Sequence, residues 1–160
     1  MAIFLECDGI KGNVTADGYK DQIQLNSCRF SVSRGVSMEP GNVSNREVTR
    51  PALTEIAITK EADTSVISLF KESVSGDSGK KVIIHFARTG TAKMEEFMTY
   101  ELENCIVSSY SISAESEGVP QEKLTLSYSK LIVKYKNTGE SGKDGSQQVA
   151  GYSVTDGKPI

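Results

Sequence analysis

The chain has 160 residues, with 18 Lys and Arg against 21 Asp and Glu and a formal net charge of −3. Its 38% apolar and 24% charged residues are ordinary for a soluble globular protein, and its length is enough to bury a core without a metal or a disulfide. The acidic balance and the lack of Trp argue against a nucleic-acid-binding surface, and no apolar run approaches the ~20 residues that a membrane-spanning helix needs. We therefore expect one domain over residues 1–160, with no membrane insertion.

Apolar residues recur mainly with a period of two, which predicts β-strands. The clearest run covers residues 98–112. In this run Met98, Tyr100, Leu102, Ile106, Tyr110 and Ile112 are expected to share the face that packs on the core. The other predicted strands cover residues 3–7, 22–34, 54–58, 81–88, 122–135 and 149–154.

Two of these strands change phase partway. In residues 22–34 the apolar face passes from Leu25 to Cys28, and in residues 122–135 it passes from Tyr128 to Leu131. A period of two cannot shift without a bulge, or a bend that carries the strand into a second sheet. The two shifts favour a closed or nearly closed barrel with corners over one flat sheet.

One segment has the spacing of a helix. Apolar residues recur there at helical intervals, N-cap candidates stand at 63–65, and Gly76 follows its end. We predict a helix over about residues 64–75 with an apolar face formed by Val66, Ile67, Phe70 and Val74. Flexible loops are expected near 33–51 and 137–148.

The chain offers little for catalysis. A catalytic triad would have to use the single histidine, His85, which lies in a predicted strand. The segment 76–79 is interpreted as a turn from helix to strand rather than as a nucleophile loop. Cys7, Cys28 and Cys105 are scattered and odd in number, which predicts small buried side chains in a reducing compartment rather than disulfides. We expect no enzyme activity, no metal and no cofactor.

Several segments of the chain, taken in order, resemble the haemolysin-coregulated protein (Hcp) family, whose members are tube subunits of the type VI secretion system. The likeness runs from Phe4 to Val154, and its most specific segments cover residues 45–51, 55–63, 102–110 and 126–131. The family commonly has a Trp-Ser-Trp-like segment in its second strand, whereas this chain has Cys28-Arg29-Phe30. Tyr152 likewise stands where the family often has Trp.

The resemblance implies a mainly β fold: a β-barrel of two antiparallel sheets with one flanking α-helix. It also implies a homohexameric ring of head-to-tail subunits, and rings that stack into a tube. The expected partners are other copies of the chain, effectors in the lumen, a contractile sheath and a tip spike protein. The protein would be made in the bacterial cytoplasm without a signal peptide and then secreted by the type VI system.

The resemblance also indicates candidate site residues. The face of the second strand that carries Ser27, Arg29 and Ser31 would border the lumen and contact cargo; the alternative is an ordinary solvated strand face. A second set of residues is expected to contact neighbouring subunits or rings: Val43, Arg46, Glu47, Val48 and Arg50. The alternative is that they belong to a mobile surface loop. A stand-alone β-barrel that binds a ligand in an internal pocket is the alternative for the whole protein.

Overall fold

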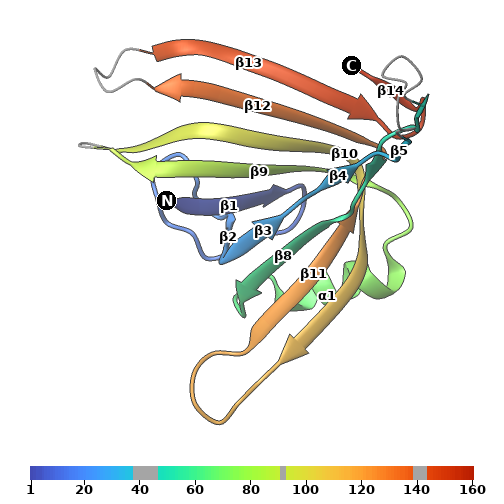
Figure 1. Cartoon of the computed structure of the whole chain (residues 1–160). Coiled ribbons are helices and arrows are strands. Elements are labelled where there is room, and N and C mark those ends of the chain that lie inside the picture. The colour runs from blue at the N-terminus through green and yellow to red at the C-terminus, as the bar shows by residue number, and fades with distance from the viewer. Residues whose placement is uncertain (38–46, 91–92, 139–143) are drawn as a thin grey trace.

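The computed structural model describes residues 1–37, 47–90, 93–138 and 144–160. These residues form one helix and fourteen strands (Figure 1). In chain order they are β1 (Ala2–Cys7), β2 (Ile23–Leu25), β3 (Ser27–Arg29), β4 (Val32–Ser33), β5 (Val36–Ser37), β6 (Glu47–Val48), β7 (Ala52–Leu53), β8 (Ile56–Glu61), α1 (Val66–Ser75), β9 (Lys80–Thr89), β10 (Met94–Ser113), β11 (Gln121–Ser127), β12 (Lys130–Thr138), β13 (Asp144–Ser153) and β14 (Lys158–Pro159). The prediction of a mainly β chain with a helix near 64–75 is confirmed.

Strand β10 belongs to two antiparallel sheets (Figure 1). Its first part pairs with β9 on one side and β12 on the other, within a sheet ordered β2-β1-β9-β10-β12-β13-β14, which we call sheet A. Its last part pairs with β11 in a sheet ordered β10-β11-β8-β3, which we call sheet B. One continuous strand therefore joins the two sheets along one side of the molecule.

Both phase changes seen in the sequence mark the passage of the chain from one sheet to the other. The chain leaves sheet A after β2 and enters sheet B at β3, and the Asn26 N–H between them donates to the carbonyl of Thr59 at 2.7 Å. It returns from sheet B to sheet A between β11 and β12 at residues 128–129. There the Tyr128 hydroxyl donates to the carbonyl of Thr54 at 2.8 Å. Within the described residues, the ladders do not close into one hydrogen-bonded barrel.

The long strand β10 carries a phase shift that the sequence did not reveal. Asn104 has a φ of +53°, and the pairing with β9 is irregular between Leu102 and Cys105. As a result Cys105 is buried with 6% exposure, while Ile106 lies opposite Ser127 and turns away from the core. The expectation that Ile106 shares the core face with Leu102 is therefore wrong.

The helix presents a different face to the core from the one predicted. Leu69 is its buried residue, whereas the side chains of Ile67 and Val74 are 74% and 67% exposed. Phe70 is also exposed but lies edge-on to Tyr110, with ring centroids 6.0 Å apart. The apolar spacing correctly located the helix, but its rotation is set by the contacts at its first turn.

Those contacts come from a fully buried ion pair. Lys60 lies directly opposite Glu122, on the same face of sheet B as the core residue Ile58, and both charged side chains have 0% exposure. The Lys60 ammonium donates to Glu122 and, at 3.1 Å, to Asp63 Oδ1, while the Tyr110 hydroxyl donates to Glu122 Oε1 at 2.5 Å.

Asp63 connects this pair to the helix. The backbone N–H and the hydroxyl of Ser65, the residue before α1, both donate to Asp63 Oδ1. The buried charges are thus paired and hydrogen-bonded, as such groups must be to be tolerated in a core. We infer that the ion pair fixes where the helix starts and how it is rotated on sheet B.

Removing one partner of this pair should be costly. We expect Lys60→Met to lower the free energy of unfolding by about 3–5 kcal/mol, because Glu122 would remain buried without its counter-charge. The double variant Lys60→Met/Glu122→Leu should recover most of that loss. Urea unfolding measures both. As a control, Lys134→Met removes a half-buried bridge to Glu101 (2.7 Å), whose partners are 32% and 19% exposed, and should cost about 1 kcal/mol. Equal losses from the two single variants would contradict this account.

Candidate functional site

Much of the outward face of sheet B is polar. Two rows of directly opposed residues cross its four strands, and every member is small, hydroxyl-bearing or cationic. We call this set the hydroxyl face: Ser27, Thr59, Lys123 and Ser111 in one row, and Arg29, Ala57, Thr125 and Ser109 in the other.

Hydroxyl groups on this face bond to one another across strands. Ser27 Oγ lies 2.5 Å from Thr59 Oγ1, and Ser109 Oγ lies 2.6 Å from Thr125 Oγ1. Arg29 and Lys123 are exposed and form no salt bridge within the described part of the chain. The face therefore offers two free positive charges on a background whose hydrogen bonds are largely satisfied internally.

The structure places the predicted cargo residues on one strand and just beyond it. Ser27 and Arg29 lie on β3 and are exposed, while Cys28 and Phe30 pack against the core. Ser31 follows the strand, and its N–H donates to Thr54 Oγ1 at 3.0 Å. The rest of the hydroxyl face, on β8, β10 and β11, was not predicted from the sequence. The sequence does carry a pattern that could have indicated it. Thr59 and Thr125 alternate with buried residues along β8 and β11, which is typical of an outward polar face.

The second set of predicted residues is only partly described. Val43 and Arg46 lie outside the described residues, and Glu47 and Val48 are known through their backbone, which forms β6 opposite β5. Arg50 is exposed, and its guanidinium lies beside Gly157 in the turn before β14. The two strand pairs β4–β7 and β5–β6 thus hold the described part of this segment at the end of the molecule where the C-terminal strand lies (Figure 1).

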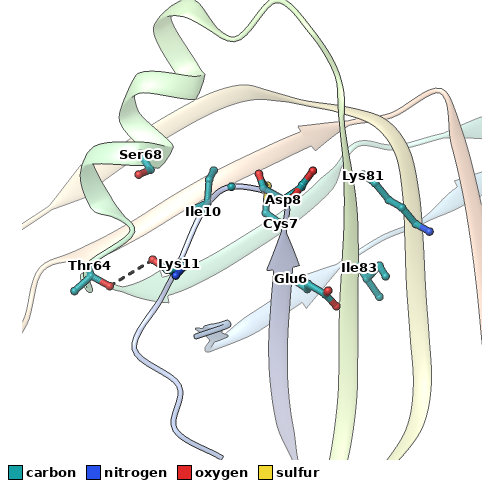
Figure 2. A pocket seen from close by; sticks show the side chains of 10 residues that line it. Glu6, Cys7, Asp8, Ile10, Lys11, Thr64, Ser68, Lys81 and Ile83 are labelled. Atoms are coloured by element: carbon teal, nitrogen blue, oxygen red, sulfur yellow. Dashed lines mark hydrogen bonds between the residues drawn. The ribbon is translucent and has the colours of Figure 1, made fainter. Parts of the chain in front are cut away.

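An open hollow of about 700 Å³ lies on the outer side of sheet A (Figure 2). It is bounded by the turn after β1, the start of α1 and strand β9. Thr64 and Lys11 close one side through a 3.4 Å hydrogen bond from the Thr64 hydroxyl to the Lys11 carbonyl, while Glu6 and Ile83 lie on the strands at the other side. The hollow mixes carboxylates, ammonium groups and hydroxyls, so no single ligand charge is favoured.

Among the described residues, the space between the sheets beneath α1 is much smaller. A cavity beneath α1, lined by core residues such as Leu5, Leu69 and Leu124, measures about 20 Å³, enough for one water molecule. The core there is filled by side chains. This observation gives no support to a ligand bound inside the barrel.

His85 is not placed for nucleophilic catalysis. Its two ring nitrogens face carboxylates, Nδ1 at 2.6 Å from Glu96 Oε2 and Nε2 at 2.9 Å from Glu6 Oε2. A catalytic histidine needs one nitrogen free to take the proton of a nucleophile. Within the described residues, no group of three or more His, Cys, Asp and Glu side chains is arranged to hold a metal ion. No described helix is long and apolar enough to cross a membrane.

The three cysteines also lack the features of reactive thiols. All are free, Cys105 is buried, and Cys7 and Cys28 are half-buried. Burial raises the pKa of Cys7 and of Cys28 to about 11, and that of Cys105 to about 12. Reactive cysteines have a lowered pKa and an electropositive environment, so these residues act as small core side chains.

Comparison with known proteins identifies one family. The model of the family described as "Type VI secretion system effector, Hcp" matches residues 4–135. No curated protein matches the chain.

Solved structures share the fold over nearly the whole chain. The structure of a type six secretion system protein is similar with a TM-score of 0.91 and 22% identity, covering 99% of each chain. Hcp1 from Salmonella typhimurium has a TM-score of 0.79 and 25% identity, covering 99% of this chain and 98% of that one. The sheath–tube complex of an extracellular contractile injection system has a TM-score of 0.55 and 17% identity, covering 83% and 88%.

The raised pKa values of the thiols predict slow alkylation. At pH 8 we expect Cys7 and Cys28 to react with iodoacetamide about a hundredfold more slowly in the folded chain than in urea, since a two-unit rise in pKa lowers the thiolate fraction about a hundredfold. The rate should increase with pH until about pH 11. Mass spectrometry of each cysteine over time measures this. A cysteine that reacts as fast when folded as when unfolded would indicate an activated thiol and would favour the enzyme hypothesis.

Proposed function

Because this chain belongs to the Hcp family of the type VI secretion system, we propose that it is a structural subunit of the system's inner tube. In this role it forms hexameric rings that stack, carries and chaperones effectors in the lumen, and is itself secreted. The family match over residues 4–135 is the observation that carries the proposal. The end-to-end likeness of fold to a type six secretion system protein is consistent with it.

We assign the hydroxyl face to the wall of the lumen. Its hydroxyl groups largely satisfy one another, and its eight residues include no large apolar side chain, so it offers a passing protein no extended apolar patch to bind. The free charges of Arg29 and Lys123 would attract acidic surfaces weakly and reversibly, as exposed charges do. Cargo held in this way can be released.

We assign the contacts between subunits and rings to the segment that includes Glu47, Val48 and Arg50, with Val43 and Arg46. Its described part lies at one end of the molecule, beside the turn before β14. A surface at one end suits head-to-tail association, in which two different surfaces of the chain meet. The sheath and the tip spike protein would be the outer partners of the assembled tube.

A catalytic role is not proposed, since His85 is enclosed by carboxylates and the thiols have raised pKa values. A ligand-binding module remains the second candidate because of the open hollow in Figure 2, whose volume falls within the ~300–1,000 Å³ of small-molecule sites. Such a module would work as a monomer, whereas a tube subunit must assemble.

Assembly is therefore the decisive test of the proposed function. Light scattering on the purified chain should give a mass of about six times 17.3 kDa, and negative-stain images should show rings with a central opening. Stacks of rings are expected at high protein concentration. A chain that stays monomeric at millimolar concentration would contradict the tube role and favour the binding module.

Arg29→Glu tests the assignment of the hydroxyl face to the lumen. We expect rings to form normally, and their affinity for a fluorescent oligo-glutamate peptide to fall about fivefold or more, which corresponds to ~1 kcal/mol at an exposed charge pair. Lys123→Glu should act in the same direction, because it lies on the same face. Lys81→Glu, an equal charge change at an exposed residue of sheet A, is the control and should leave peptide binding unchanged. If Arg29→Glu breaks the rings, Arg29 belongs to an interface and the assignment is wrong.

A further inference from the structure

The single histidine of the chain is held between two strands on the outer side of sheet A. His85 on β9 places Nε2 2.9 Å from Glu6 Oε2 on β1, and Nδ1 2.6 Å from Glu96 Oε2 on β10. Its side chain is 14% exposed, and the carboxylates are 52% and 38% exposed. Both ring nitrogens thus face acceptors, and the two acceptors come from the strands on either side.

A chain segment is fastened over this histidine. Residues 12–22 cross the outer side of sheet A, and Tyr19 lies edge-on to His85 with ring centroids 5.6 Å apart. The Tyr19 hydroxyl donates to Glu96 Oε2 at 3.2 Å, the same oxygen that faces His85. Beneath the segment is a second, small apolar cluster separate from the main core: Phe4, Val14, Tyr19 and Ala87.

The protonation state of His85 decides whether both contacts are hydrogen bonds. A neutral imidazole carries one N–H, so one of its nitrogens would turn a lone pair toward a carboxylate. The imidazolium donates from both nitrogens. We propose that His85, Glu6 and Glu96 form a proton-operated clasp, which ties β1 and β10 to β9 and holds residues 12–22 against sheet A when His85 is protonated, and which loosens when His85 loses the proton.

The direction of the pH effect follows from the groups around the ring. Burial lowers the pKa of His85, but hydrogen bonds and charge interactions with Glu96 and Glu6 outweigh burial and raise the pKa above its ordinary value of 6.5. The stabilisation is therefore complete below pH 6.5 and is lost as pH rises through the raised value. The hydrogen bond from His85 lowers the pKa of Glu96, so in acid the contact persists until Glu96 itself is protonated.

Other charged groups on this side of sheet A are engaged elsewhere or lie farther along the strands. Glu101 on β10, whose Cα partner is Ile83, is bonded to Lys134 on β12 at 2.7 Å. Lys81 on β9 borders the hollow (Figure 2). Thr99 and Phe4 are the Cα partners of His85 on the two adjacent strands, and neither titrates. Asp17, Lys20 and Asp21 lie on the crossing segment, but the charge partners of His85 are Glu96 and Glu6. Glu6, Glu96 and Tyr19, which bonds Glu96, are therefore the groups that set the state of the clasp.

Titration of the histidine by NMR tests the first half of the proposal. Because His85 is the only histidine, its ring signal needs no assignment by mutation. We expect a midpoint above 6.5 in the native chain, a lower midpoint in Glu6→Gln and in Glu96→Gln, and a midpoint below 6.5 in the double variant, where only burial remains. Glu95→Gln removes the neighbouring charge on the same strand and should shift the midpoint by less than half as much. A native midpoint at or below 6.5, or one insensitive to Glu6→Gln and Glu96→Gln, would overturn the clasp.

Amide hydrogen exchange tests the second half. The N–H groups of Val14, Tyr19 and Asp21 are hydrogen-bonded within residues 12–22. After division by intrinsic rates, their protection should fall severalfold between pH 6 and pH 8.5, while amides in β11 keep theirs. His85→Gln keeps a polar side chain that does not titrate, and should abolish this dependence on pH. Protection of residues 12–22 that does not change with pH in the native chain would show that His85 does not fasten them.

Discussion

One strand has to serve two sheets, and the rest of the structure depends on how β10 does so. A strand that kept strict alternation would present the same face in both sheets, and could not turn the corner between them. Asn104, in the left-handed region at φ +53°, breaks the alternation at this corner. Gly79 accommodates the break, because a Cβ there would lie 2.5 Å from the Asn104 backbone. A second irregularity, between Val107 and Ser109, turns Ser109 and Ser111 outward. Both breaks in alternation along β10 therefore determine which side chains form the hydroxyl face.

The sequence predicts the strands and the two points where the chain changes sheet, because buried faces of strands leave a strong period of two. The sequence does not predict the bulge at Asn104. One inserted polar residue in a long strand gives the same sequence pattern as a polar residue on the core face of a regular strand. The sequence also does not predict that Lys60 and Glu122 are buried opposite each other. Their strands, β8 and β11, are neighbours in sheet B but lie far apart along the chain. Burial of a charged residue can be predicted only when its ion-pair partner is known. The start of α1 is linked to this ion pair, because Lys60 and the Ser65 N–H both donate to Asp63.

The candidate site, too, is only partly predictable from the sequence. Alternation on β3 correctly separates Ser27 and Arg29 from the core-facing Cys28 and Phe30. These residues continue into a polar surface that is four strands wide. This continuation depends on the register of β3, β8, β11 and β10, which cannot be predicted from a local sequence pattern. The arrangement around His85 is likewise built from three strands and a crossing segment, so the isolated histidine carried no sign of its two carboxylates.

The outer edge of β13, the outermost long strand of sheet A, affects how the chain can associate. β14 pairs with Tyr152 and Ser153 of β13, and the Ile160 N–H donates to the Gly151 carbonyl at 3.0 Å. Within the described residues, the outer edge of β13 before Gly151 pairs with no other strand. Residues 146–150 read Ser-Gln-Gln-Val-Ala, without the proline or charged side chains that usually protect a sheet edge. The chain by itself thus exposes backbone groups to which another extended chain can hydrogen-bond. Whether it forms β-linked aggregates then depends on the protein concentration and on whether another chain covers this edge.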